Sequence, residues 1–272
     1  MRVLVTGAAG SVGRIVCSGL AARGHDVVGL DLVGTPAVRP LEELGWHVVD
    51  CADPVAVDAV VATAQPDGIV HLAGNPDESA LPEALVSHVH TTAALLEAMV
   101  RHAVPRLVLA SSNHAVGRTP RAALPDGVLT GDARPRPDTF YGVGKVAAEA
   151  LLSLYADRHG LDTVACRIGS LLDRPTTRRQ LSTWLSPEDC VRMVDAALSC
   201  PSPGFAVLYG VSANTRGWWD LAPGRALGYQ PQDDAEEFAA EVEATRATTS
   251  DEIEAAYVGG PYATPEVQRP AF

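Results

Sequence analysis

The chain has 272 residues, of which 47% are hydrophobic and 20% are charged. This composition excludes a disordered, collagen-like or disulfide-scaffold protein, and the length allows one large α/β domain or two small ones. With 21 Lys and Arg against 33 Asp and Glu, the formal net charge is −12. So acidic a surface neutralises phosphates poorly, which argues against a nucleic-acid partner.

The sequence also suggests a compartment. Met1–Gly7 is a short apolar run that ends at a glycine, so we expect no secretory signal, and no later stretch has the length of a membrane span. The cysteines are odd in number and none are at metal-ligand spacing, which predicts reduced thiols, no metal site and a cytoplasmic protein. They are Cys17, Cys51, Cys166, Cys190 and Cys200.

Short β-rich runs alternate with helical stretches over the first two-thirds of the chain. The predicted strands are residues 2–6, 26–30, 46–49, 68–72, 106–111 and 163–168, and the predicted helices are residues 11–23, 55–63, 81–102 and 138–159. Such alternation predicts right-handed βαβ units. We therefore expect an α/β protein with a doubly wound parallel sheet, a Rossmann fold.

After Gly169 this alternation ends. A helix at 187–199, a strand at 205–209 and an acidic helix at 233–244 lie among loops, and from about Thr245 the tail is irregular. This part is too short and too weakly apolar for a second core. We expect residues 1–169 to form a nucleotide-binding core. Residues 170–272 would be a small C-terminal cap and tail packed on that core, the tail clasping the body or a neighbour.

A glycine-rich turn joins the first predicted strand to the first predicted helix. Gly7, Gly10 and Gly13 permit a tight turn, close approach of the backbone to a pyrophosphate, and close packing of helix on strand. The helix that begins at Ser11 and Val12 offers free N–H groups to the phosphates. The pattern predicts a dinucleotide site; a purely structural turn is the alternative.

The predicted cofactor is NAD. Asp31 closes the second strand about 20 residues after the turn, where its carboxylate can accept both adenosine-ribose hydroxyls and repel a 2′-phosphate. Arg14, after the third glycine, could meet a phosphate, and Asp31 could be a solvated turn carboxylate instead. Further cofactor contacts are expected at other strand ends, namely Leu32, Asp50, Cys51, Leu72, Ala73, Gly74 and Ile168, although Asp50 and Cys51 could equally form a loop cap.

The predicted reacting centre is a Tyr–Lys pair. Tyr141 and Lys145 are four residues apart on a predicted helix and share one face. The ammonium should lower the pKa of the phenol towards neutrality, and a phenolate can take a proton from an alcohol while a hydride leaves its carbon. On most helices such a pair is only a core Tyr and a surface Lys. A hydroxyl donor beside Tyr141 is expected from Ser111–His114, which end a strand at the edge where ligands bind.

The glycine turn, a serine and the Tyr–Lys pair together resemble the extended short-chain dehydrogenase/reductase superfamily, with its sugar epimerases and dehydratases. The resemblance implies that Ser112, five residues before Gly117, is the catalytic serine, that Lys145 also holds the nicotinamide ribose, and that the protein is a homo-oligomer.

Four strings in order resemble uronate dehydrogenases over most of the chain: Ser111–His114, Arg167–Ser170, Leu181–Trp184 and Ser212–Asp220. This resemblance implies oxidation of D-glucuronate or D-galacturonate by NAD at the anomeric carbon, giving an aldarolactone. The chain departs from these relatives at two places. His88 stands where many extended members have Asn, and the Asn75–Pro76 loop lacks a serine expected near the substrate.

A uronate is a small anion with a planar carboxylate, which an arginine binds bidentately and a lysine does not. The register of Ser182–Trp184 selects Arg179 over its neighbours Arg174 and Arg178, and Ser170 would add a hydroxyl. The sugar hydroxyls would meet Ser112, Asn113, His114 and Tyr141. The structural alternatives are a solvated loop arginine, a turn serine and a satisfied histidine.

Two other functions are consistent with part of the pattern. A nucleotide-sugar epimerase or dehydratase would keep NAD bound, but it needs a larger substrate domain than the short cap here. A non-catalytic NAD sensor would be expected to lack Tyr141 or Lys145, and both are present.

Overall fold

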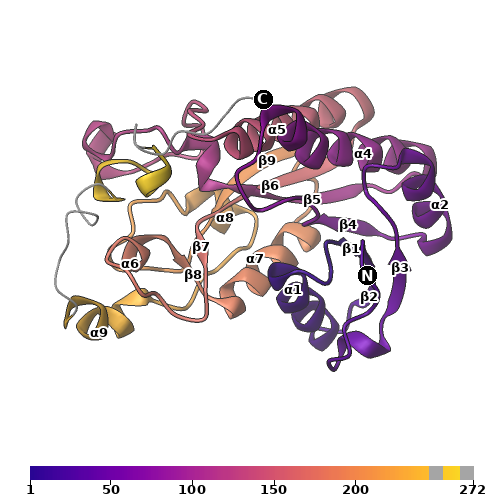
Figure 1. Cartoon of the computed structure of the whole chain (residues 1–272), viewed down its shortest axis with the longest axis horizontal. Coiled ribbons are helices and arrows are strands. Elements are labelled where there is room, and N and C mark those ends of the chain that lie inside the picture. The colour runs from indigo at the N-terminus through magenta and orange to yellow at the C-terminus, as the bar shows by residue number, and fades with distance from the viewer. Residues whose placement is uncertain (245–253, 264–272) are drawn as a thin grey trace.

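The computed structural model describes residues 1–244 and 254–263 of the chain. Seven strands form one parallel sheet in the order β3-β2-β1-β4-β5-β6-β9 (Figure 1). They are β1 (Arg2–Thr6), β2 (Asp26–Asp31), β3 (Gly45–Val48), β4 (Gly68–His71), β5 (Arg106–Ser112), β6 (Asp162–Ile168) and β9 (Phe205–Gly210). The strand order reverses beside β1, which confirms the predicted doubly wound fold.

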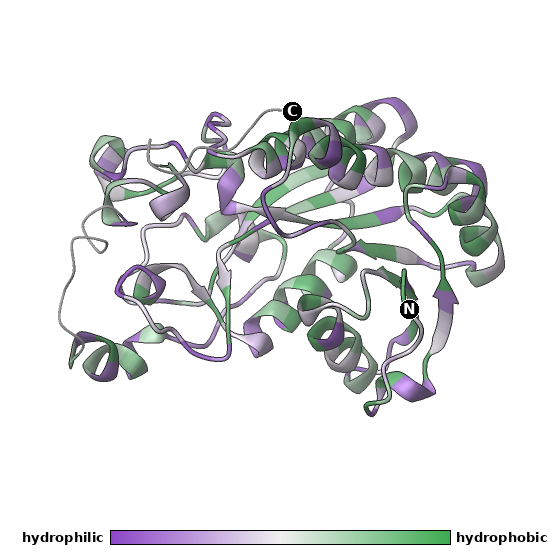
Figure 2. Ribbon diagram, viewed as in Figure 1, coloured by the Kyte–Doolittle hydropathy of each residue, from purple (hydrophilic) through white to green (hydrophobic). Residues whose placement is uncertain are grey.

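Helices cover both faces of the sheet (Figure 1). One face carries α1 (Ser11–Ala22) and α7 (Pro187–Ser199), and the other carries α2 (Pro54–Ala64), α4 (Thr91–His102) and α5 (Phe140–His159). Central strands buried on both sides need continuous apolar runs, and Val3–Val5 and Ile69–Val70 are fully buried. Figure 2 shows the hydrophobic residues concentrated on these strands and the helices beside them.

The predicted helix over residues 81–102 is not regular throughout. It consists of α3 (Leu81–Leu85), a π-helical turn (Val86–His90) and α4. The hydroxyls of Thr91 and Thr92 donate to the carbonyls of Ser87 and His88, at 2.7 and 2.6 Å, and such side-chain bonds compete with the regular helical ladder. π turns are frequent at functional sites, and this one carries the buried His88.

The chain after residue 169 contributes to two sheets. β9 pairs with β6 and completes the central sheet, while β7 (Ser170–Leu171) and β8 (Trp184–Leu185) form a small parallel sheet that the sequence did not predict. The acidic helix expected at 233–244 is a 3-10 turn (Ala235–Phe238) followed by α9 (Ala239–Ala244). The division of the chain at residue 169 stays a prediction. The other short helices are α6 (Gln180–Thr183), α8 (Ala222–Ala226) and 3-10 turns at Leu41–Glu43, Asn113–Val116, Arg121–Ala123, Pro125–Gly127 and Gly260–Ala263.

Residues 254–263 form a segment that we call the C-terminal strap. Its backbone follows the loop after β5, since Val258 N donates to Thr119 O at 3.0 Å and Gly259 N donates to Gly117 O at 2.9 Å. Val258 is fully buried in an apolar cluster with Val116 and the Trp218–Trp219 pair. The strap therefore packs against the body of the protein, and the rest of the predicted tail lies outside the described residues.

Candidate functional site

The glycine turn is closed by contacts that exclude any side chain. Gly7 has a φ of 68°, and a Cβ there would lie 2.7 Å from Ala73 N; a Cβ on Gly13 would lie 2.1 Å from Gly7 O. Helix α1 therefore packs directly on the turn. Gly10 is its N-cap residue and supplies no side-chain cap, which leaves the N–H groups of the first turn available to an anion. This arrangement fits a pyrophosphate.

Asp31 lies at the end of β2 beside this turn. Its Oδ2 accepts a hydrogen bond from Ala9 N at 2.8 Å, so the carboxylate both supports the turn and stands where an adenosine ribose is expected. Leu32 next to it is 67% exposed, as a residue flanking a bound adenosine would be. Arg14 Nε donates a hydrogen bond to Ala9 O at 2.7 Å, so this side chain is bonded to the backbone of the glycine turn.

The other predicted cofactor contacts divide into two groups. Leu72, Ala73 and Gly74 follow β4 directly, and Ile168 is paired with Ser112 across β5 and β6, so all four lie at the carboxyl edge of the sheet. Asp50 instead accepts a hydrogen bond from Ala52 N at 2.8 Å, which is the loop-cap role. Cys51 is buried in the core, and burial raises the pKa of its thiol to about 12.

The structure brings the three predicted catalytic side chains together. Tyr141 lies at the start of α5, and a hydrogen bond links it to Ser112 at the end of β5. Lys145 Nζ lies 5.3 Å from the centre of the Tyr141 ring and donates to Ala110 O at 2.7 Å. The phenol, the hydroxyl and the ammonium therefore meet at one end of the sheet.

The expected lowering of the Tyr141 pKa is not found. Burial raises the pKa of Tyr141 to about 12, although the hydrogen bond with Ser112 acts in the opposite direction. Burial also lowers the pKa of Lys145 to about 8, while the nearby charge of Glu149 opposes that change. Sequence spacing could place the ammonium on the same helical face, but it could not weigh desolvation against charge.

His88 packs directly against the tyrosine. Its ring meets that of Tyr141 edge-on, with 4.9 Å between centres, and its Nδ1 is buried without a partner among the described residues. Gly74 and Gly144 make room for it, since a Cβ on either would lie within 2.8 or 3.0 Å of the imidazole. Burial lowers the pKa of His88 to about 3, so the ring is neutral. The sequence identified His88 as a departure from its relatives without indicating this contact.

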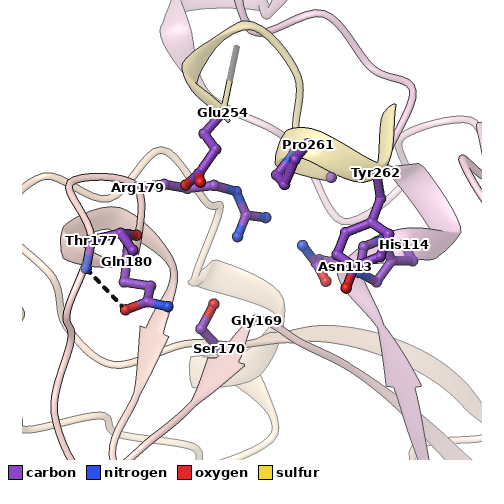
Figure 3. A pocket seen from close by; sticks show the side chains of 11 residues that line it. Asn113, His114, Gly169, Ser170, Thr177, Arg179, Gln180, Glu254, Pro261 and Tyr262 are labelled. Carbon is purple, nitrogen blue, oxygen red and sulfur yellow. Dashed lines mark hydrogen bonds between the residues drawn. The ribbon is translucent and has the colours of Figure 1, made fainter. Parts of the chain in front are cut away.

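Two adjoining cavities open beside these residues, and His114 and Tyr262 line both of them. The cavity next to Tyr141 has a volume of about 320 Å³ and is also lined by Pro76, Asp77, Glu78 and Thr139. The other, of about 250 Å³, is also lined by Asn113, Gly169, Ser170, Thr177, Arg179, Gln180, Glu254, Gly259 and Pro261 (Figure 3).

Arg179 supplies the cation of the second cavity. Its Nη2 donates to Val258 O in the strap at 2.7 Å, while its Nε is buried without a partner in the part of the chain that the structure describes. The guanidinium points towards the space between Ser170 and Asn113 (Figure 3). Burial lowers the pKa of Arg179, and the charges of Glu254 and Asp138 act against this. A buried guanidinium with an unused N–H favours an anionic ligand.

The neighbouring arginines make contacts with α9 instead. Arg174 pairs with Glu241 on α9 at 3.5 Å and is mostly exposed, and Arg178 donates to Glu243 O at 3.2 Å.

The polar side chains around Arg179 are fixed by hydrogen bonds to neighbouring groups of the protein. Ser170 Oγ lies 2.9 Å from Thr183 Oγ1, and Asn113 Nδ2 donates to Val258 O at 3.5 Å. His114 Nδ1 lies 3.0 Å from both carboxylate oxygens of the fully buried Asp138. Because the carboxylate holds Nδ1, the other ring nitrogen of His114 is available to a ligand.

Sequence reasoning missed the contributions of two segments. Tyr262 from the strap packs edge-on against His114, with 5.1 Å between ring centres, and lines both cavities. Glu78, in the loop after β4, accepts hydrogen bonds from the backbone of Phe140 and Tyr141. Neither segment carries a motif; the strap reaches the site only through tertiary packing.

An open nucleotide turn at a topological switch point, with Ser, Tyr and Lys beside it, defines a protein of the extended short-chain dehydrogenase/reductase type. Residues 3–183 match the NAD dependent epimerase/dehydratase family, and the chain belongs to this family.

The relatives that match nearly the whole chain include uronate dehydrogenases. The chain is 37% identical to a uronate dehydrogenase from Pseudomonas putida, over 96% of this chain and 95% of the relative. The crystal structure of uronate dehydrogenase from Agrobacterium tumefaciens superposes with a TM-score of 0.88 at 36% identity, covering 100% of this chain and 98% of that one. A tyrosine-to-alanine mutant of the same protein, solved with NAD, gives a TM-score of 0.89 at 36% identity and the same coverage.

These comparisons confirm the predicted resemblance, an NAD-dependent oxidoreductase, and NAD as its cofactor. Among the described residues, no helix is long and apolar enough to cross a membrane. The homo-oligomeric state and the cytoplasmic location stay predictions.

Proposed function

We propose that the protein oxidises a free hexuronate, D-galacturonate or D-glucuronate, at C1 with NAD and releases the aldarolactone. The observation that carries this proposal is the buried guanidinium of Arg179, which lines the cavity adjoining the one beside Tyr141 and whose Nε has no partner among the described residues. The identity of 37% to a uronate dehydrogenase supports it. The two cavities, about 250 and 320 Å³, suit a monosaccharide better than a nucleotide sugar.

The substrate would lie across both cavities. Its carboxylate binds Arg179 and the Ser170 hydroxyl at one end, and a planar guanidinium matches both carboxylate oxygens. Asn113 and His114 bind ring hydroxyls in the middle. This places the anomeric carbon at the Tyr141 end, where Ser112 donates to its hydroxyl oxygen.

The reaction then needs one base and one hydride acceptor. NAD, when bound along the glycine turn, accepts the hydride. Tyr141 takes the proton of the C1 hydroxyl as the C1–H bond breaks, and Ser112 holds the oxygen. Lys145 binds the nicotinamide-ribose hydroxyls and stabilises the phenolate. Since the ring oxygen remains bonded to C1, the product is a lactone, lighter than the substrate by two hydrogens.

NADH absorbance with free uronates tests the proposal. The purified protein with NAD and D-galacturonate or D-glucuronate should produce NADH, and mass spectrometry should find the lactone before it hydrolyses. No NADH from either uronate, together with turnover of a nucleotide sugar, would instead identify a nucleotide-sugar epimerase or dehydratase.

A further inference from the structure

The first turn of α5, which carries Tyr141, is held by a side chain from a distant loop. Glu78 Oε1 accepts from Phe140 N at 2.9 Å and Oε2 accepts from Tyr141 N at 3.0 Å, although Glu78 lies 62 and 63 residues earlier in the chain. Thr139, the N-cap residue, accepts from Gly142 N at 2.9 Å. The first N–H groups of the helix are therefore all bound.

The usual cap comes from within the helix terminus itself, as the Thr139 cap does here. A carboxylate that uses both oxygens on two adjacent N–H groups is a stronger anchor, because the bonds are charge-assisted and lie at the positive end of the helix. The same N–H groups offset the charge of Glu78. That offset makes a carboxylate compatible with a cavity that receives an anionic sugar.

The loop that carries Glu78 is fixed at its start by two hydrogen bonds of Asn75. Asn75 N donates to the Ser87 hydroxyl at 2.6 Å, and the Asn75 side chain accepts from Asp77 N at 3.0 Å. The loop begins at Gly74, where the cofactor is expected, and Glu78 ties it to the tyrosine helix. Helix ends fray most easily, so a residue in the first turn needs such an anchor if its side chain is to stay in place.

We propose that Glu78 is a positioning residue for Tyr141, which fixes the first turn of α5 so that the phenol stays against Ser112 and the C1 hydroxyl of the substrate. The inference rests on the proposed function, in which Tyr141 is the base. Glu78 makes no proton transfer of its own; it acts through the backbone of Tyr141.

Loss of the Glu78 hydrogen bonds should change the pKa of Tyr141, which a general loss of stability would not do. The groups that face Tyr141 are His88 from the π turn, His114 after β5, Lys145 on α5 and Ser112. The hydrogen bond with Ser112 lowers the pKa of Tyr141. Asp77 and Glu78 line the same cavity as Tyr141, and loss of the Glu78 charge alone would lower the pKa of the phenol. A phenol that drifts from Ser112 instead loses the effect of that hydrogen bond, so the base would require a higher pH.

The experiment compares Glu78→Ala and Glu78→Gln with Asp53→Ala. Asp53 is a matched control, since its carboxylate accepts from Val55 N and Ala56 N at the start of α2. We expect the Glu78 variants to lower kcat for uronate roughly 10- to 100-fold, as a small misplacement of a reacting group does. The acid limb of the kcat–pH profile should move to higher pH, and the Kd for NAD should stay within about threefold. Asp53→Ala should lower Tm without these kinetic changes.

Unchanged kcat and an unchanged pH profile in the Glu78 variants would overturn the inference, and so would a loss of NAD affinity that parallels the loss of kcat. If Glu78→Ala does not fold, Glu78→Gln, which keeps the shape and one acceptor, carries the test. Tyr141→Phe is measured alongside. An active Tyr141→Phe would refute Tyr141 as the base, whereas an inactive Tyr141→Phe with a normal Glu78→Ala would refute only the role of Glu78.

Discussion

Val258 O accepts a hydrogen bond from Arg179 Nη2 at 2.7 Å and another from Asn113 Nδ2 at 3.5 Å. One backbone carbonyl of the C-terminal strap thus fixes two side chains that reach the site from different parts of the fold, one from the segment before α6 and one from the end of β5. The carbonyl binds Nη2, and the guanidinium lines the cavity of about 250 Å³. The strap therefore shapes this cavity through a backbone carbonyl, and its Glu254 lines the same cavity.

Arg179→Ala should weaken the use of uronate. A carboxylate must shed water to bind here, and hydrogen bonds to a charged group contribute about 1.5–3 kcal/mol, so kcat/KM should fall roughly 10- to 100-fold or more. Arg179→Lys should recover only part, since a point charge cannot match both oxygens. The control is the neutral parent aldose, on which residual activity should fall far less. Equal losses on both sugars would mean that Arg179 supports the fold instead.

Tyr141→Phe should lower kcat by roughly 10²- to 10⁴-fold, the usual contribution of a positioned acid–base group, with little change in the Kd for NAD. Lys145→Met should lower kcat and weaken NAD binding together, because the ammonium is proposed to hold the nicotinamide ribose. Steady-state kinetics and NAD titration on both variants separate the two roles. Near-normal turnover by Tyr141→Phe would remove the phenolate mechanism.

The pH dependence should differ between the ligand-free and the cofactor-bound protein. Burial raises the pKa of Tyr141 to about 12 in the ligand-free site, so the neutral phenol is favoured there. The positive charge of an oxidised nicotinamide ring favours the phenolate and should lower that pKa. Ultraviolet titration of ligand-free protein, against a variant lacking this phenol, should find Tyr141 near its raised value. The acid limb of kcat at saturating NAD should lie several pH units lower; coincident values would contradict the argument.

Much of this site could be predicted because its residues are coded by local pattern. The glycine turn, the strand ends at Asp31 and Ser112, and the Tyr141–Lys145 spacing each depend on a few adjacent residues and on the geometry of a parallel sheet. The resemblance to relatives added Arg179, which the structure places in the cavity wall.

The remaining features depend on contacts that no local pattern encodes. Glu78 meets Tyr141 N across 63 residues, and the strap meets Arg179 across 79. The π turn at Val86–His90 replaces a stretch whose apolar periodicity predicts regular helix, and the pKa of Tyr141 depends on burial, which sequence spacing does not measure.

Asp31→Ser should weaken NAD binding and narrow the preference over NADP. The wild-type carboxylate would repel a 2′-phosphate and accept the ribose hydroxyls, and serine removes the repulsion. Part of the loss of NAD affinity should come from a weakened glycine turn, because Ala9 N loses its hydrogen-bond acceptor. Kd values of both cofactors measure the effect, with Asp53→Ser as the control, since Asp53 caps α2. Use of NADP by the wild type equal to that of NAD would contradict this role.

Gly260→Ala should raise the KM for uronate, although the residue bears no functional group. A Cβ at Gly260 would lie 2.7 Å from Arg179 Nε and 2.9 Å from Arg179 Cδ, so the guanidinium must move from its place in the cavity wall. We expect KM for uronate to rise about 10-fold or more, with an unchanged Kd for NAD, since misplaced binding groups lose their contacts steeply with distance.

The matched control is Gly160→Ala. Gly160 ends α5 with a φ of 67°, against 65° for Gly260, and a Cβ there would meet nothing within 4 Å. Both variants carry the same strain of a left-handed backbone, about 1–2 kcal/mol per residue. The Tm should therefore fall by a similar amount in both. Only Gly260→Ala should lose uronate affinity, and the neutral parent aldose should be affected much less. If the two variants show the same KM for uronate, the strap does not set the position of Arg179, and the carboxylate subsite does not depend on it.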